Sequence, residues 1–234
     1  MSWRLSKRAL LAALCLTPGL AFGEDVQMWH WWTNEVDLTR KTSLVIHGQF
    51  RTKRPLGEFL QGRSGPILRY YIKPKRALVG GYFYRREPQP GRLSFGDSHR
   101  YFGGIEDYQL LAKKGPAPAS LFETRFLVER FAGGPEGTLT NYTRFRHRHR
   151  FSFREWKVSP LVGYEVFFFP DGFWGQRPHG GIRWTPNPKM MLDVGYIWDG
   201  RAPRAGSRNG LIFTNLLIRF KRTPDPDFPN RPAF

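Results

Sequence analysis

Hydrophobic and polar side chains alternate along most of this chain, which is typical of β-strands. Successive side chains of a strand point to opposite faces, so a period of two gives each face its own character. Residues 44–51 place Leu44, Ile46 and Phe50 on one face, opposite a face of mostly polar side chains. Residues 68–73 repeat this division. Each predicted strand therefore has one apolar side and one charged side.

Eleven segments of this kind follow one another, with no linker or change of composition between them. The chain is rich in Gly, Pro and aromatic residues and shows no helical periodicity, which indicates an all-β chain with one domain. The predicted strands cover residues 29–38, 44–51, 67–73, 78–85, 101–112, 121–131, 142–154, 161–169, 180–184, 190–198 and 211–220.

Tight and long connections alternate between these segments. The tight ones are residues 40–41, 73–75, 155–156 and 186–188, and the long ones are 52–65, 86–100, 132–138, 170–179 and 199–209. This alternation predicts an antiparallel up-and-down transmembrane β-barrel of about 10–12 strands. Bacterial barrels have even strand numbers, so we expect ten or twelve strands and one miscounted segment, near Trp29 or Tyr101.

An arginine row marks the inward face most clearly. Within residues 142–154, four arginines share one face, and Phe145, Phe151 and Phe153 share the other. A charged side chain at the bilayer midplane costs roughly 2–4 kcal/mol in a barrel, so this row must face the lumen and the aromatic face must meet lipid. The predicted lumen cations are Arg125, Arg144, Arg146, Arg148, Arg150 and Arg183.

Carboxylates on the adjoining segments are the expected counter-charges. Counting residues back from each hairpin turn pairs Arg146 with Glu165, Arg183 with Asp193, Glu123 with Arg148 and Glu129 with Arg144. Two interpretations of such an interior stay open. The pairs fill a small structural barrel, or the excess of arginine over acid makes a narrow pore that prefers anions.

The first residues predict export. Three cations, Arg4, Lys7 and Arg8, precede an apolar run over residues 9–22 that is too short to span a bilayer as a helix. We therefore expect a signal peptide over residues 1–23, the barrel over 24–220 and a Pro-rich periplasmic tail over 221–234. The single cysteine, Cys15, lies within this signal, so the mature chain is expected to contain neither disulfides nor thiolate metal sites.

The charge balance is strongly basic, with a formal net charge of +18. Removing the three cations of the predicted signal leaves +15. Export excludes nucleic acid as the expected partner of this charge. The expected partners are outer-membrane lipid and lipopolysaccharide, the barrel-assembly machinery and small anions. No cofactor or metal is expected, because His147 and His149 share the apolar face without a third ligand nearby.

Two further classes of protein compete with this interpretation. A soluble periplasmic β-sandwich or small barrel that binds an anionic ligand would show the same alternation, with its apolar face as the core. A lipid-modifying barrel enzyme would need Ser and His at the outer rim, and no such cluster is evident from local spacing. The pairs at Gly80, Gly103 and Gly180 indicate bulges or close backbone approaches rather than phosphate-binding loops.

Several short motifs resemble the bacterial family called domain of unknown function 2490. They are Trp31-Trp32 with residues 44–51, Gly80-Gly81-Tyr82, the alternating arginines of 144–150, residues 164–168, Gln176-Arg177, residues 181–184 and residues 192–196. The chain departs from the family pattern in its Pro-rich tail and at residues 105–108. The resemblance implies an outer-membrane barrel and transfers no catalytic residue.

Overall fold

We describe the fold from a computed structural model of the chain. It describes residues 27–53, 58–88, 94–111, 120–133, 142–153, 156–170, 172, 174–187, 189–202 and 209–221. The predicted signal peptide and residues 222–234 of the predicted tail lie outside this set. Within the described part of the chain, no helix is long and apolar enough to cross a membrane.

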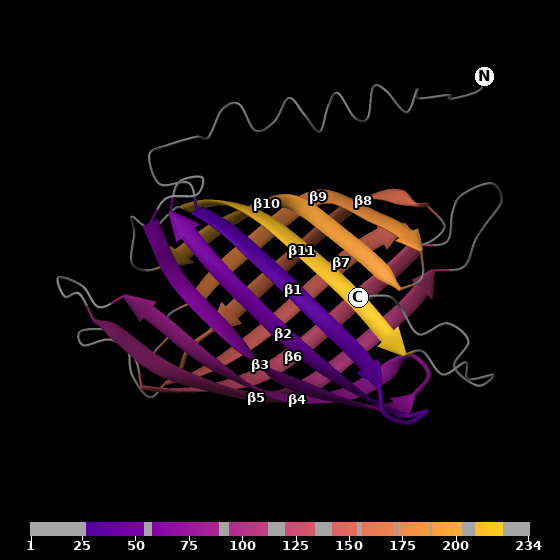
Figure 1. Ribbon diagram of the computed structural model, residues 1–234, viewed down its shortest axis with the longest axis horizontal. Helices are drawn as coiled ribbons and strands as arrows, with labels where there is room; N and C mark the ends of the chain where they lie inside the picture. Colours follow the sequence, from indigo (N-terminus) through magenta and orange to yellow (C-terminus); the bar gives the residue numbers. More distant parts are fainter. Residues whose placement is uncertain are drawn as a thin grey trace, which may run out of the picture.

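The strands of the described residues form one closed β-barrel and wrap obliquely around its axis (Figure 1). Eleven strands follow one another around the barrel in chain order. They are β1 (Gln27–Asp37), β2 (Thr42–Lys53), β3 (Glu58–Lys73), β4 (Arg76–Pro88), β5 (Phe95–Leu111), β6 (Ser120–Gly133), β7 (Thr143–Phe153), β8 (Val158–Phe168), β9 (Trp174–Asn187), β10 (Met190–Ala202) and β11 (Asn209–Lys221).

The odd strand number contradicts the expectation of ten or twelve strands. All eleven predicted segments are strands, including those near Trp29 and Tyr101, so no segment was miscounted. Ten neighbouring pairs are antiparallel, so the first and last strands run in the same direction and their pairing is parallel, with Trp29 opposite Phe213. The barrel is therefore mixed rather than wholly antiparallel.

The strands are longer than the sequence pattern predicted, and the connections are correspondingly shorter. Residues 58–65, predicted as loop, belong to β3, and residues 95–100 and 174–179 belong to β5 and β9. The Gly and Pro residues that suggested loops are accommodated within paired strands, as where Pro66 faces Ile46. One end of the barrel carries short turns, such as Pro74-Lys75, and we call it the short-turn end and the other the loop end.

The two faces of each strand differ as predicted. Each of the eleven strands exposes at least one large hydrophobic side chain on the outside, for example Trp32 on β1 and Phe126 on β6. Charged side chains such as Glu129 and Asp193 are fully buried inside. Apolar side chains join them there in three clusters, one of which contains Phe83 and Leu127. The interior is thus a mixed layer of charges and aromatic rings.

Candidate functional site

The barrel encloses a cavity of about 1050 Å³. Side chains from the inward faces line it, and they include the aromatic rings of Trp31, Phe83 and Phe213. Among the described residues that line it, eleven are arginines and two are glutamates. The lining arginines are Arg51, Arg63, Arg69, Arg85, Arg100, Arg125, Arg144, Arg146, Arg148, Arg150 and Arg177.

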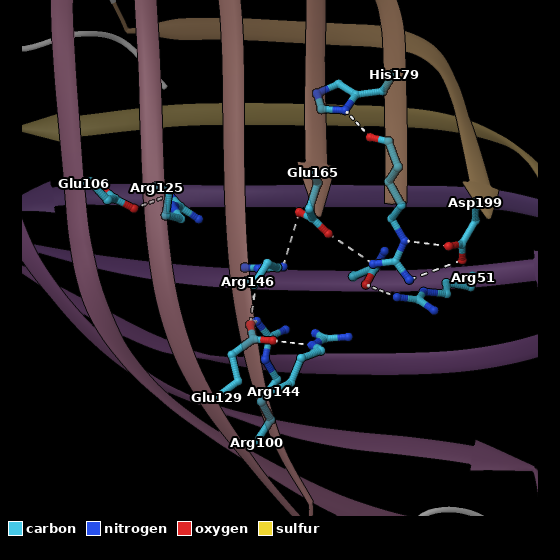
Figure 2. A network of polar contacts seen from close by, with 12 residues as sticks. Arg51, Arg100, Glu106, Arg125, Glu129, Arg144, Arg146, Glu165, His179 and Asp199 are labelled. Carbon is cyan, nitrogen blue, oxygen red and sulfur yellow. Dashed lines mark hydrogen bonds and ion pairs between the residues drawn. The ribbon is translucent and has the colours of Figure 1, made fainter. Parts of the chain in front are cut away.

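One chain of ion pairs crosses the interior nearer the loop end, and we call it the loop-end network. Glu129 of β6 lies at its centre and pairs with Arg100, Arg144 and Arg146 (Figure 2). Arg146 reaches Glu165 at 3.6 Å. From there the chain continues through Arg177, which contacts Glu165 at 3.2 Å and binds both carboxylate oxygens of Asp199 at 3.0 and 3.2 Å. The network links β5 to β10.

A second chain, the short-turn network, lies nearer the other end. Glu35 of β1 binds Arg219 of β11 at 3.1 Å and Arg69 of β3 at 3.3 Å. Arg69 also donates to Glu106 of β5 at 2.8 Å, and Glu106 pairs in turn with Arg125 of β6. This network joins strands that are distant in the sequence, because the barrel closes between β1 and β11.

An apolar cluster also closes the interior at the short-turn end. Tyr108 and Leu121, from β5 and β6, pack with Met191 and Leu217, from β10 and β11. These two pairs of strands are not neighbours in the sheet, so the cluster crosses the lumen. All four side chains are at least 97% buried. The cavity is therefore bounded at this end by a layer of packed side chains.

With this geometry described, the chain can be compared with known proteins. The model of the family "Protein of unknown function (DUF2490)" matches residues 26–209. The chain belongs to that family. None of the curated proteins and none of the solved structures matches it. For this DUF2490 member, the family therefore supplies no activity.

The predicted lumen residues of this DUF2490 protein all lie on inward faces, but two predicted pairings are wrong in register. Asp193 lies opposite Arg183, which binds both its carboxylate oxygens at 2.8 and 3.1 Å, as predicted. Glu129 likewise lies opposite Arg144.

The other two predicted pairs are shifted by two residues. Glu165 lies opposite Arg148 rather than Arg146, and Glu123 lies opposite Arg150 rather than Arg148. Ser152 pairs with Leu161, so the β7–β8 register is centred on residues 156–157 rather than 155–156, which accounts for the first shift. Arg146 still reaches Glu165 because its side chain is long enough to cover the offset.

Three arginines of the cavity wall, Arg63, Arg148 and Arg150, have no ion pair with a described carboxylate. Arg63 of β3 and Arg148 and Arg150 of β7 form no hydrogen bond or ion pair within the described part of the chain, and the Nε atoms of Arg63 and Arg150 are buried without an acceptor. Arg63 and Arg148 interact electrostatically with Arg146, a like charge. Arg63 also lies over the ring of Phe83, at 5.3 Å from its centroid. Glu129 and Glu123 compensate Arg63 and Arg148 only from a distance, without an ion pair.

The sequence pattern missed about half of the charged interior. The buried members of the two networks that were not predicted are Glu35, Arg69, Arg100, Glu106, Arg177, Asp199 and Arg219. Alternation places each of them on the polar face of its strand, so the pattern contained the signal. The prediction considered mainly the arginine row of β7 and the strands next to it, and therefore did not include these residues.

The outward pair of histidines is not part of this site. The rings of His147 and His149 lie 4.3 Å apart, and His149 bonds to the hydroxyl of Thr124 at 3.0 Å. No group of three or more His, Cys, Asp or Glu that could hold a metal occurs among the described residues.

Proposed function

We propose that this protein is a non-enzymatic outer-membrane β-barrel whose interior cavity takes up small anions. The observation that carries the proposal is the opposition of its two faces: apolar side chains surround the outside, while eleven arginines and two glutamates line the described cavity wall. A protein that folds in water buries its apolar face and exposes its charges. The arrangement here is reversed, as expected for a barrel solvated by lipid.

Strand length and aromatic placement support the membrane setting. The strands contain 11 to 17 residues, and a tilted strand needs about 9–11 residues to cross a bilayer. Exposed aromatic rings lie near both ends, with Trp156 and Trp184 towards the short turns and Phe168 and Trp174 towards the loops. Such rings form the interfacial girdles of outer-membrane barrels. A soluble sandwich gives no reason for them.

The interior charge supports the choice of ligand. The loop-end network contains four arginines and three carboxylates, and three further arginines of the wall, Arg63, Arg148 and Arg150, have no ion pair within the described structure. Unpaired cations in a lumen attract anions and repel cations. We therefore expect chloride, phosphate or small organic anions to enter in preference to cations.

Cell fractionation tests the membrane part of the proposal. The mature protein should begin at Glu24 by Edman sequencing, should be recovered with outer membranes and should need detergent for extraction. Unheated samples should migrate differently from heated ones on gels, because closed barrels resist unfolding by detergent. Recovery in the osmotic-shock supernatant would show a soluble periplasmic protein instead.

Single-cysteine labelling tests the orientation of the faces. Removal of the predicted signal removes Cys15, so the labelled residue is the sole thiol. A spin label at Phe145, 38% exposed on the outside, should report lipid, whereas one at Arg146 should report water or protein. The same contrast is expected between Ile46 and Gln49. Equal lipid accessibility at both members of a pair would contradict the membrane barrel.

A second candidate function is a purely structural barrel, which the dense ion pairing of Figure 2 favours. Arg146→Glu separates the two, because it places a carboxylate beside Glu129 and Glu165. If the lumen takes up anions, the variant should fold and bind phosphate more weakly than the wild type does. If the lumen is only structural, the variant should fail to fold, whereas Arg76→Glu at the exposed rim should fold in both cases.

A further inference from the structure

The cavity differs from an open pore in the distribution of its charges along the barrel. Near the short turns, Glu35, Glu106 and Asp193 are buried in ion pairs with arginines, and the apolar cluster of Tyr108, Leu121, Met191 and Leu217 crosses the interior beside them. Buried charges of opposite sign compensate each other there. The surplus of positive charge is therefore concentrated in the cavity above this layer.

Arg63 and Arg148 define the centre of that surplus. They project from β3 and β7, which are four strands apart, into the same cavity. Both interact with Arg146, and His47 of β2 lies within electrostatic range of Arg63 and Arg146. Uncompensated buried cations cost stability, so their presence needs a compensating partner. No described carboxylate lies within ion-pair distance of Arg63 or Arg148, although Glu129 and Glu123 act on them from further away, so an anion in the cavity can supply the missing contacts.

The number of these arginines and their position on different walls of the cavity indicate which kind of anion they would bind. A carboxylate brings one charge and two acceptor oxygens, whereas a phosphate brings about two charges and three strong acceptor oxygens. Guanidinium groups bind phosphate oxygens in pairs, and cations that converge from opposite walls can share one such group. The cavity of about 1050 Å³ is the size of an organic-ligand pocket and is far larger than a single phosphate requires. Its aromatic rings, including Trp31 and Phe213, offer a surface for an organic framework.

We propose that Arg63, Arg146 and Arg148 form a binding site, inside a cavity closed at the short-turn end, for an organic anion that carries two or more phosphate groups. This site deepens the proposed uptake of anions and rests on it, but it does not depend on the membrane location. The aromatic part of the wall contacts the framework of the ligand, and the three guanidinium groups bind its phosphates. The packed layer below the site retains the ligand instead of passing it through.

Isothermal titration calorimetry of the full mature chain in detergent micelles tests this site. Inositol hexakisphosphate and inorganic tripolyphosphate are the probes, and citrate supplies three carboxylates for comparison. Both phosphate probes should bind at least tenfold more tightly than citrate. The double variant Arg63→Gln/Arg148→Gln should lose at least tenfold in affinity for them. Citrate that binds as tightly as tripolyphosphate would overturn the phosphate assignment.

A matched control distinguishes binding of the probes at this site from nonspecific attraction of the probes to a basic protein. Arg86→Gln/Arg130→Gln removes the same two charges from the exposed outside, where Arg86 is 3.9 Å from Asp97 and Arg130 bonds to Thr143. This control should bind the probes as the wild type does. Equal weakening in both double variants would mean that net charge alone attracts the probes, and would overturn the site.

The melting temperature without ligand distinguishes a binding role of the two arginines from a structural role, because the two roles predict shifts in opposite directions. Removing two buried cations that have no ion pair should raise the melting temperature of Arg63→Gln/Arg148→Gln above that of the wild type. A variant that melts lower, or fails to fold, would mean that the two arginines stabilise the empty barrel, and the site would be wrong. If the protein conducts anions selectively but binds neither probe, this inference is wrong and the proposed uptake of anions stands. If it neither conducts anions nor binds a probe, the proposed function is wrong as well.

Discussion

Glu129 is compensated by three arginines. It is fully buried on β6, and Arg100, Arg144 and Arg146 reach it from the two neighbouring strands. A carboxylate so placed neutralises one charge of three and accepts hydrogen bonds at both oxygens. Removing its charge should therefore cost much more than breaking an ion pair at the exposed rim, because it leaves buried arginines without their carboxylate.

We predict that Glu129→Gln destabilises the barrel by about 3–5 kcal/mol, the range for breaking a buried ion pair. The amide is nearly the same size, so lost charge rather than lost volume causes the effect. Urea unfolding in lipid vesicles, followed by tryptophan fluorescence, measures it. The control Asp107→Asn removes a half-exposed partner of Arg76 and should cost less than about 1 kcal/mol. Equal effects of the two changes would contradict the central role of Glu129.

The sequence pattern predicted ion pairs between consecutive strands but not ion pairs between strands that are far apart in the sequence. Glu129 and Arg144 lie on consecutive strands, so counting across one hairpin finds them. Glu35 and Arg219 are 184 residues apart and meet only because the barrel closes. No local count predicts that contact, and the same holds for Arg69 and Glu106, which are separated by β4.

At the scale of the strand, glycine shows how closely adjacent backbones approach. Gly104 faces inward on β5, where an added Cβ would lie 1.9 Å from the carbonyl oxygen of Phe126. Gly103 faces outward, where the nearest atom to an added Cβ is 3.8 Å away. The sequence predicted a close approach or bulge at this pair of glycines. The structure confirms the close approach at Gly104 but not at Gly103.

We predict that Gly104→Ala destabilises the barrel by about 1–3 kcal/mol or prevents its closure, because the methyl group has no space and a backbone must shift. Gly103→Ala makes the same chemical change one residue away and should fold as the wild type does. The fraction of protein with heat-modifiable gel mobility after refolding measures both. A similar loss in the two variants would show that the backbone freedom of glycine, and not the close contact, matters here.

The strand pattern predicted which residues face outward but underestimated the strands themselves. Glycine and proline normally end strands, so residues 58–65 were assigned to a loop. In the barrel, Gly65 sits where an added Cβ would lie 2.0 Å from the backbone oxygen of Tyr82. The glycine is therefore required by the tight packing of β3 against β4, which sequence composition alone does not reveal.

At the scale of the whole molecule, the strand number decides how the barrel closes. With eleven strands joined by hairpins, every consecutive pair is antiparallel, and the last pair cannot be. The parallel β1–β11 seam is continuous from Gln27 opposite Leu211 to Glu35 opposite Arg219. An even strand number would instead require an antiparallel seam, so the seam is the contact that distinguishes the two architectures.

We predict that the double variant His30→Cys/Thr214→Cys forms a disulfide across this seam. The two side chains lie on the outside at paired positions, and the His30 Nδ1 is 2.9 Å from the Thr214 hydroxyl. Oxidation of the purified mature protein should link the two ends of the barrel, as detected by mass spectrometry of tryptic peptides. His30→Cys/Ile218→Cys is the matched control, because a shift of four residues moves the second thiol by roughly 13 Å, beyond the reach of a disulfide. A crosslink in the control but not in the first variant would mean that β1 and β11 pair in another register, and no crosslink in either would contradict the closed eleven-stranded barrel.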